Sequence, residues 1–297
     1  MTLLALAIGD GQFAAAQVAA GADADQVGRI PQPTRDVWPA CRDLLLDKAA
    51  GTSVSAVGIA CSGPIDMATG VVAPSEIPEW RTGFGIVEAV RKTFPSAEVT
   101  LALDGVCLAF AERSLGPLRD AVDSVVISAS THISGGLQIG GFTVVGRTGN
   151  AGNFGHTLVP GFDEPCECGG RGCLDAVAGG AALLRWARTQ GWRGDSATEL
   201  VRAADQGDHI ALAAADRAGT ALGRAIASVA VLLDVDLVIV GGSLALPGNA
   251  LWRPLGKAVA QHAKQSYLTT LRVVPSTLGE DGVLIGAGVI AVVNGSR

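Results

Sequence analysis

The chain has 297 residues, enough for one large domain or two medium ones, and 48% of them are apolar, which supports a substantial core. Its net charge of −6 argues against a basic patch for nucleic acid and against a polybasic membrane anchor. The longest mostly apolar run of the C-terminal half, residues 225–233, is too short to span a bilayer. We therefore expect a globular protein that binds neither nucleic acid nor membranes.

Extended apolar runs alternate with segments of helical spacing along the whole chain. In chain order the predicted elements are strands 3–8 and 13–18, helix 38–49, strand 54–60, helix 86–93, strand 99–103, helix 104–115, strands 122–129 and 137–139, helices 176–189, 197–204 and 210–233, strand 237–240, helix 250–264, strand 271–274 and helix 284–293. This alternation predicts an α/β fold whose sheets are covered by helices.

A coarse internal repeat suggests how the chain is divided. Residues 3–18 and 124–141 both read as strand, glycine-rich turn and strand, and each precedes a further series of strands and helices. Such halves resemble the duplicated, ribonuclease H-like domain of the actin-like and sugar-kinase ATPases, in which two hairpin turns face a central cleft and hold nucleotide phosphates. The repeat alone leaves two unrelated hairpins open as an alternative.

The segment 155–175, GHTLVPGFDEPCECGGRGCLD, contains four good zinc ligands. His156, Cys166, Cys168 and Cys173 form a Cys₃His set that closes a tetrahedral shell, and neighbouring glycines let the chain fold back around one ion. A closed shell leaves no position for a reactive water, so we predict a structural zinc. The alternative is an ordinary surface loop with three reduced cysteines and a histidine.

The other cysteines, Cys41, Cys61 and Cys107, lie in apolar contexts, where a small buried thiol is favoured over a disulfide. This usage is typical of a reducing cytoplasm, and no signal peptide is visible at the first apolar run. The expected location is cytoplasmic.

Six motifs in order resemble the ROK family, which groups bacterial sugar kinases, including glucokinases, with related transcriptional repressors. They lie at residues 58–72 (GIACSGPIDMATGVV), 77–80 (IPEW), 146–156 (GRTGNAGNFGH), 155–175, 238–245 (VIVGGSLA) and 276–288 (STLGEDGVLIGAG). Repressor members have a winged-helix segment before the first strand. This chain begins at that strand, so we expect no DNA-binding role.

The resemblance implies phosphoryl transfer from Mg-ATP to a sugar hydroxyl. Asp104, in the sequence LALDGV, matches the position of the catalytic aspartate, which acts as the base toward the attacking hydroxyl. It lies where a strand ends and a helix begins, so a simple helix N-cap is the alternative.

The resemblance also assigns nucleotide-binding positions, although both phosphate loops depart from the family pattern. Ala7 replaces a carboxylate associated with Mg²⁺, and serines at 130 and 134 replace glycines. His132 also replaces a glycine, and it could contact phosphate, but we interpret it as a solvent-facing turn histidine. The expected nucleotide contacts are Gly9, Gly11, Thr131, Gly135, Gly136, Gly241 and Gly242.

The implied sugar contacts are Glu76, Asn153, His156 and Asp175. Three of them are replacements: Glu76 for asparagine, and Asn153 and Asp175 for glutamates. His156 is retained, and in the family it both ligates zinc and touches the sugar. Because a polar pocket rejects ligands that leave its groups unpaired, these changes leave the identity of the sugar open.

Three functions follow as hypotheses. The first is a glucokinase-like ROK sugar kinase that phosphorylates a hexose or amino sugar. The second is a catalytically silent ROK-fold protein that binds a sugar or metabolite and acts as a regulator or partner subunit, and the third is a scaffolding subunit. We expect a smaller N-terminal domain of residues 1–110 plus 281–297, a larger domain of 111–280, and a homodimer or homotetramer.

Overall fold

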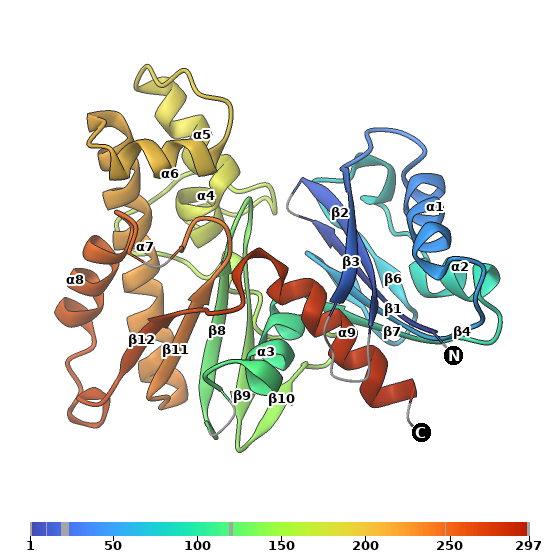
Figure 1. Cartoon of the computed structure of the whole chain (residues 1–297). Helices are drawn as coiled ribbons and strands as arrows, with labels where there is room; N and C mark the ends of the chain where they lie inside the picture. The colour runs from blue at the N-terminus through green and yellow to red at the C-terminus, as the bar shows by residue number, and fades with distance from the viewer. Residues whose placement is uncertain (1, 10, 19–23, 119–120, 247, 296–297) are drawn as a thin grey trace. The chain divides into compact units, whose positions relative to one another are not determined.

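The computed structural model describes residues 2–9, 11–18, 24–118, 121–246 and 248–295. The chain forms two compact units (Figure 1): Met1–Arg119 with Thr143–Gly152 and Asp281–Arg297, and Asp120–Phe142 with Asn153–Glu280. The predicted division places 111–119 and 143–152 in the second domain, whereas the structure assigns both segments to the first unit.

The first unit is a five-stranded sheet with helices on both faces. Strand order is β3-β2-β1-β4-β7, in which β1 pairs antiparallel with β2 and parallel with β4, and β4 pairs parallel with β7. The helices α1 and α2 lie on one face and α3 and α9 on the other (Figure 1). The elements are β1 (Thr2–Gly9), β2 (Gln12–Val18), β3 (Ala24–Pro31), α1 (Val37–Ala49), β4 (Val54–Cys61), β5 (Ile65–Asp66), β6 (Val71–Val72), a 3₁₀ turn (Pro78–Trp80), α2 (Ile86–Thr93), β7 (Glu98–Leu103), α3 (Asp104–Leu115) and α9 (Gly282–Gly295).

The helix α9 completes the core of this unit. Leu284, Ala287 and Ile290 are buried among the side chains of the sheet. The contact is so close that a Cβ on Gly58 of β4 would lie 1.9 Å from the carbonyl oxygen of Ala287. Glycine at position 58 is therefore required for the helix to reach the sheet.

The second unit repeats the same strand order, β10-β9-β8-β11-β12, with an antiparallel β8–β9 hairpin followed by parallel β11 and β12. The predicted internal repeat is thus confirmed. The elements are β8 (Ser124–Ala129), β9 (Ile133–Ile139), β10 (Phe142–Val144), a 3₁₀ turn (Phe154–His156), α4 (Leu174–Ala178), α5 (Gly180–Thr189), α6 (Ala197–Asp205), α7 (His209–Leu233), β11 (Leu237–Gly241), α8 (Trp252–His262), a 3₁₀ turn (Ser266–Leu268), β12 (Arg272–Pro275) and a 3₁₀ turn (Gly279–Asp281).

The structure differs from the predicted elements in several places, and the strands β5, β6 and β10 were not predicted. The strand β3 was missed because Asp25, Gln26 and Arg29 interrupt its apolar residues, as is common for an edge strand. The strand β9 begins at Ile133 rather than 137, which shortens the preceding turn to 130–132. The predicted helix 176–189 is two helices, because Gly179 is extended and a Cβ there would lie 2.4 Å from Asp175 Oδ1.

The longest helix, α7, packs closely on α8. A Cβ on Gly219 or on Gly223 would lie 2.5 Å from a backbone oxygen of Leu251 or Leu255, so both glycines allow the two helices to touch. Among the described residues, no helix combines the length and the apolar character needed to cross a bilayer.

Candidate functional site

The carboxyl ends of three parallel strands bring the first group of predicted residues to one edge of the first sheet. Ile8 of β1 pairs with Cys61 of β4, and Cys61 pairs with Leu103 of β7. Ser62 and Asp104 follow directly on strands that are about 4.8 Å apart in any such sheet. Ligands of open α/β sheets bind at this edge, so the sheet places Asp104 where a substrate is expected.

Asp104 is the first residue of α3 and is half-buried. Leu103 occupies the N-cap position, and the Asp104 carboxylate accepts a hydrogen bond from the Gly105 N–H at 2.6 Å. Asp104 is therefore the first helical residue rather than the N-cap, although its carboxylate still accepts a backbone N–H of the first turn. The first turn of a helix nevertheless stabilises a carboxylate in its ionised form, which is the form that a general base requires.

Glu76 reaches the same edge from the loop before the 3₁₀ turn 78–80. The loop is fixed by the buried Trp80, whose ring stacks on Phe84 with 4.6 Å between ring centroids. The Glu76 carboxylate accepts a hydrogen bond from Ser62 Oγ. Burial raises the pKa of Cys61 to about 12, and the charges of Glu76 and Asp104 add to that rise, which indicates that both carboxylates lie near this thiol.

The first hairpin turn has the backbone that a phosphate loop needs but lacks the expected carboxylate. Gly9 and Gly11 have φ values of +144° and +74°, a region that favours glycine, and position 10 between them lies outside the described residues. Ala7 lies within β1, paired with Ala14 and Ala60. Its methyl group can bind no Mg²⁺.

The second hairpin turn, 130–132, is fixed from two sides. Gly180 and Ala181, at the start of α5, donate their N–H groups to the carbonyls of Ser130 and Thr131 at 2.9 and 3.1 Å. Ser130 Oγ accepts the N–H of Ser243, in the loop after β11, at 3.1 Å. Thr131 therefore lies in a rigid turn at the carboxyl edge of the second sheet.

Two of the predicted nucleotide contacts lie elsewhere. Gly135 and Gly136 are buried within β9, where they pair with Ile127 and Val126. A Cβ on Gly135 would lie 2.3 Å from the ring of Phe154. Gly135 therefore serves the packing of the sheet, and a nucleotide contact at either glycine stays a prediction.

His132 is not solvent-facing, so that interpretation was wrong. Its Nδ1 lies 3.1 Å from Asp175 Oδ2, and the two side chains are only 22% and 19% exposed. Asp175 Oδ1 accepts the Ile133 N–H at 2.7 Å. Asp175 thus contacts the side chain of His132, in the hairpin turn, and the backbone N–H of Ile133, the first residue of β9.

A groove of about 680 Å³ opens beside the loop that follows β11. Gly241 ends that strand, and Gly242 has a φ of +93° with no room for a Cβ, which would lie 2.5 Å from Ala129 O. The motif at residues 238–245 reaches this groove through Ser243, whereas the rest of the lining comes from α6, α7, α8 and the loop between. The lining residues are Thr198, Val201, Arg202, Ala204, Asp205, Leu212, Ser243, Leu246, Gly248, Asn249, Ala250 and Arg253.

The predicted zinc ligands gather in the second unit, and their ligand atoms all lie within 4.8 Å of one another. Cys168 Sγ and Cys173 Sγ are 3.8 Å apart, and Cys166 Sγ is 3.7 Å from His156 Nδ1. Zn–S bonds of about 2.3 Å in a tetrahedron give edges of about 3.8 Å, so the residues fit a zinc ion. The Gly170 N–H donates to Cys168 Sγ at 3.4 Å and lowers the pKa of Cys168, which favours the thiolate that a metal needs.

Asn153, the remaining predicted sugar contact, lies just before the 3₁₀ turn that carries His156. It is half-buried, and its carbonyl accepts the His156 N–H at 3.3 Å. The second unit therefore brings Asn153 and His156 together with the loop that carries Cys166, Cys168 and Cys173, called the metal loop below.

Comparison with known proteins decides the family. The ROK family profile matches residues 3–293. The chain belongs to the ROK family. It is 34% identical over 262 residues to a glucokinase of Aeropyrum pernix, covering 81% of this chain and 80% of that protein, and 31% identical over 271 residues to a glucokinase of Thermotoga maritima, covering 86% and 84%.

The fold of this ROK protein is also that of solved ROK structures. The ROK family glucokinase of Streptomyces griseus, solved in complex with glucose and AMPPNP, superposes with a TM-score of 0.87 at 25% identity, covering 98% of this chain and 99% of that one. The predicted actin-like α/β fold with a duplicated domain is confirmed. The His156 and cysteine cluster is consistent with the zinc-binding motif of the ROK family.

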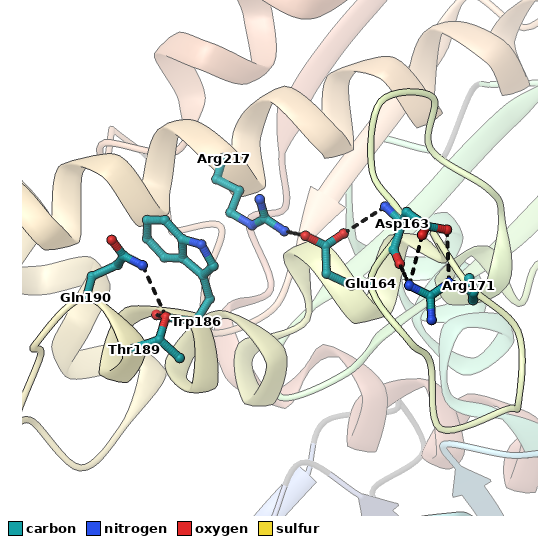
Figure 2. Close-up of polar contacts among 7 residues, drawn as sticks. All are labelled: Asp163, Glu164, Arg171, Trp186, Thr189, Gln190 and Arg217. Atoms are coloured by element: carbon teal, nitrogen blue, oxygen red, sulfur yellow. Dashed lines mark hydrogen bonds and ion pairs between the residues drawn. The ribbon is translucent and has the colours of Figure 1, made fainter.

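The metal loop of this ROK protein is anchored to α7 by Arg217, a residue that sequence analysis missed (Figure 2). Arg217 forms an ion pair with Glu164, and its guanidinium lies 4.9 Å from the ring centroid of Phe162 and 5.6 Å from that of Trp186. The carbonyl of Glu164 in turn accepts the Gly172 N–H at 2.9 Å, next to the ligand Cys173. We expect this contact to hold the loop in the shape that binds metal.

Replacing Arg217 with methionine is expected to speed the loss of zinc to a chelator about tenfold, because it removes a charged hydrogen bond and cation–π contacts while keeping much of the apolar stem. The measurement is zinc transfer to a colorimetric chelator, followed with time. Arg185→Met is the matched control, since Arg185 contacts Glu167 of the same loop only at 3.9 Å and on the surface. Equal rates for the two variants would contradict the anchoring role.

Proposed function

We propose that this ROK protein is a sugar kinase that transfers the γ-phosphoryl group of ATP to a hydroxyl of a hexose or amino sugar. Support comes from its similarity to glucokinases over four fifths or more of their length and, above all, from Asp104 at the carboxyl edge of the first sheet. There the carboxylate would orient the attacking hydroxyl and accept its proton.

The nucleotide would bind mainly through the second unit. The groove beside Ser243 suits a nucleoside, and its two arginines, Arg202 and Arg253, add positive charge at the rim. The rigid turn at Thr131 and the glycines at the end of β11, Gly241 and Gly242, suit the phosphates, because backbone N–H groups can approach them there. Gly9 and Gly11 stay proposed phosphate contacts, and Mg²⁺ would arrive with ATP.

The predicted sugar contacts Glu76, Asn153, His156 and Asp175 stay part of this proposal. Glu76 carries a carboxylate where the family pattern has an amide, so it accepts hydrogen bonds and donates none. Asp175 already contacts His132 and the Ile133 N–H, so its carboxylate also fixes the hairpin turn. Zinc, when bound to His156 and the three cysteines, would shape this loop, as a closed ligand shell implies.

Ala7 favours a second candidate, a catalytically silent member that binds a sugar without transferring phosphate. A coupled assay of ATP consumption decides between the two, using zinc-loaded protein with Mg²⁺ and a panel of hexoses and amino sugars that includes glucose, N-acetylmannosamine and fructose. Sugar-dependent turnover supports the kinase. Sugar-dependent thermal stabilisation without turnover and without ATP binding supports the silent member.

The oligomeric state, a homodimer or a homotetramer, stays a prediction, which light scattering tests.

A further inference from the structure

We propose that Cys168 and Cys173 are a peroxide-sensitive pair, which hydrogen peroxide oxidises to a disulfide with loss of the metal from the loop. The oxidation is a modification of the metal loop and does not depend on kinase activity. Its consequence for sugar binding rests on the proposed function.

The two cysteines differ in access but lie close together. Cys168 is exposed, whereas Cys173 is buried, and their Sγ atoms are 3.8 Å apart. Cys166, the third cysteine of the loop, is half-buried. The cysteines outside the loop are all buried, namely Cys41, Cys61 and Cys107. A peroxide in solution therefore reaches the Cys168 sulfur first and leaves Cys173 beside the oxidised atom.

The backbone fixes Cys173 and leaves space around the segment that follows Cys168. Cys173 pairs with Leu158 in an antiparallel β-bridge. Gly169 has a φ of +88°, and a Cβ there would meet no atom within 4 Å. Because a disulfide needs sulfurs about 2.05 Å apart, an approach of roughly 1.8 Å by Cys168 closes the bond from the observed separation.

The oxidation needs peroxide as its only co-reactant. Cysteines that hold a metal do so as thiolates, and the Cys168 thiolate attacks one oxygen of hydrogen peroxide, which gives a sulfenic acid and hydroxide. The Cys173 thiolate then attacks the Cys168 sulfur, and the S–S bond forms as a second hydroxide leaves. Two thiolates and one peroxide thus give one disulfide and two hydroxide ions. A dithiol reductant reverses the change by thiol–disulfide exchange.

The disulfide removes two of the four ligand groups of the cluster. Cys166 and His156 remain, and two ligands do not close a tetrahedral zinc shell. His156 keeps its backbone contact with Asn153, but no metal then holds its ring. Since His156 is a proposed sugar contact, we expect the oxidised protein to bind its sugar more weakly.

The test treats zinc-loaded protein with a molar excess of hydrogen peroxide. A colorimetric chelator follows the release of zinc, and mass spectrometry of unreduced peptides maps the disulfide. We expect release of about one zinc per chain together with a bond between Cys168 and Cys173, both reversed by dithiothreitol with added zinc. Cys41→Ala is the matched control and should behave as wild type, because Cys41 is buried in α1.

Two results would overturn the thiol pair. One is zinc that stays bound after peroxide treatment, or a disulfide that joins any other two cysteines. The other comes from Cys168→Ser: if Cys166 and Cys173 pair in this variant as fast as the wild-type disulfide forms, Cys168 is not the thiol that reacts first.

Steady-state kinetics tests the consequence for the sugar separately. We expect oxidation to raise the KM for the sugar about tenfold and to change kcat much less, as for the loss of one polar contact. An unchanged KM in the oxidised protein contradicts the link to sugar binding. If the disulfide forms in a protein that turns over no sugar, the thiol pair is supported and the proposed function alone fails.

Discussion

Replacing Asp104 with asparagine is expected to lower sugar-dependent ATP turnover by about two to four orders of magnitude, the usual contribution of a general base. Asparagine keeps an oxygen for the Gly105 N–H, which the carboxylate accepts at 2.6 Å, so the start of α3 should be preserved. The amide has no basic site for the proton of the sugar hydroxyl. The loss should therefore appear in kcat, with sugar and ATP affinities changed much less.

The measurement is steady-state kinetics on whichever sugar supports turnover, together with thermal unfolding of the same samples. Asp47→Asn is the matched control, because Asp47 lies on α1 with a side chain that is 70% exposed. A thermal midpoint like that of wild type would show that the fold survives. Retention of more than about a tenth of the wild-type kcat in Asp104→Asn would rule out Asp104 as the base.

Removal of zinc is expected to have the second largest effect, a fall of about 10 °C in the thermal midpoint of the second unit. The four ligand groups lie within 4.8 Å of one another, and burial raises the pKa of Cys166 and of Cys173, so without a cation these two stay neutral thiols and nothing joins the four groups. Few backbone contacts hold the tip of the loop, chiefly Cys166 N to Gly170 O at 2.9 Å and Gly169 N to Cys166 O at 3.0 Å. A loss of about 3–5 kcal/mol in the free energy of unfolding corresponds to such a shift.

The variant Cys168→Ser tests whether zinc stabilises the second unit, and it leaves the core intact because Cys168 is exposed whereas Cys173 is buried. The variant should bind no zinc by elemental analysis and unfold at the temperature of chelated wild-type protein. Adding a chelator to Cys168→Ser should change nothing further. Wild-type protein that holds about one zinc per chain yet keeps its midpoint after complete chelation would show that zinc does not stabilise the fold.

The features that can be predicted well from the sequence are set by residues close together in the chain. The metal ligands could be recognised because they lie between 156 and 173 among glycines that allow the chain to fold back. Asp104 could be placed at a strand end because an apolar run stops at Leu103 and a helical pattern begins. The two hairpins could be predicted because each strand pair is joined by a short turn.

What the sequence does not predict depends on packing between distant segments. His132 and Asp175 are 43 positions apart, and Arg217 and Glu164 are 53 apart, so no spacing rule links either pair. The groove beside Ser243 is lined by residues from 198 to 253, of which only Ser243 lies in a recognised motif. Gly135 and Gly136 were assigned to a loop by motif, although the pairing of β8 with β9 draws both into a strand.

Because α9 belongs to the first unit, that unit can complete its folding only late in synthesis. All residues of the second unit precede Asp281, whereas the core of the first unit needs Leu284, Ala287 and Ile290 from the last segment. On the ribosome, the second unit can therefore fold to completion before the first, although most of the first unit emerges earlier. Until α9 leaves the exit tunnel, the face of β1 and β4 that it covers stays open to water, and a chain truncated before residue 281 would be prone to aggregate through that face.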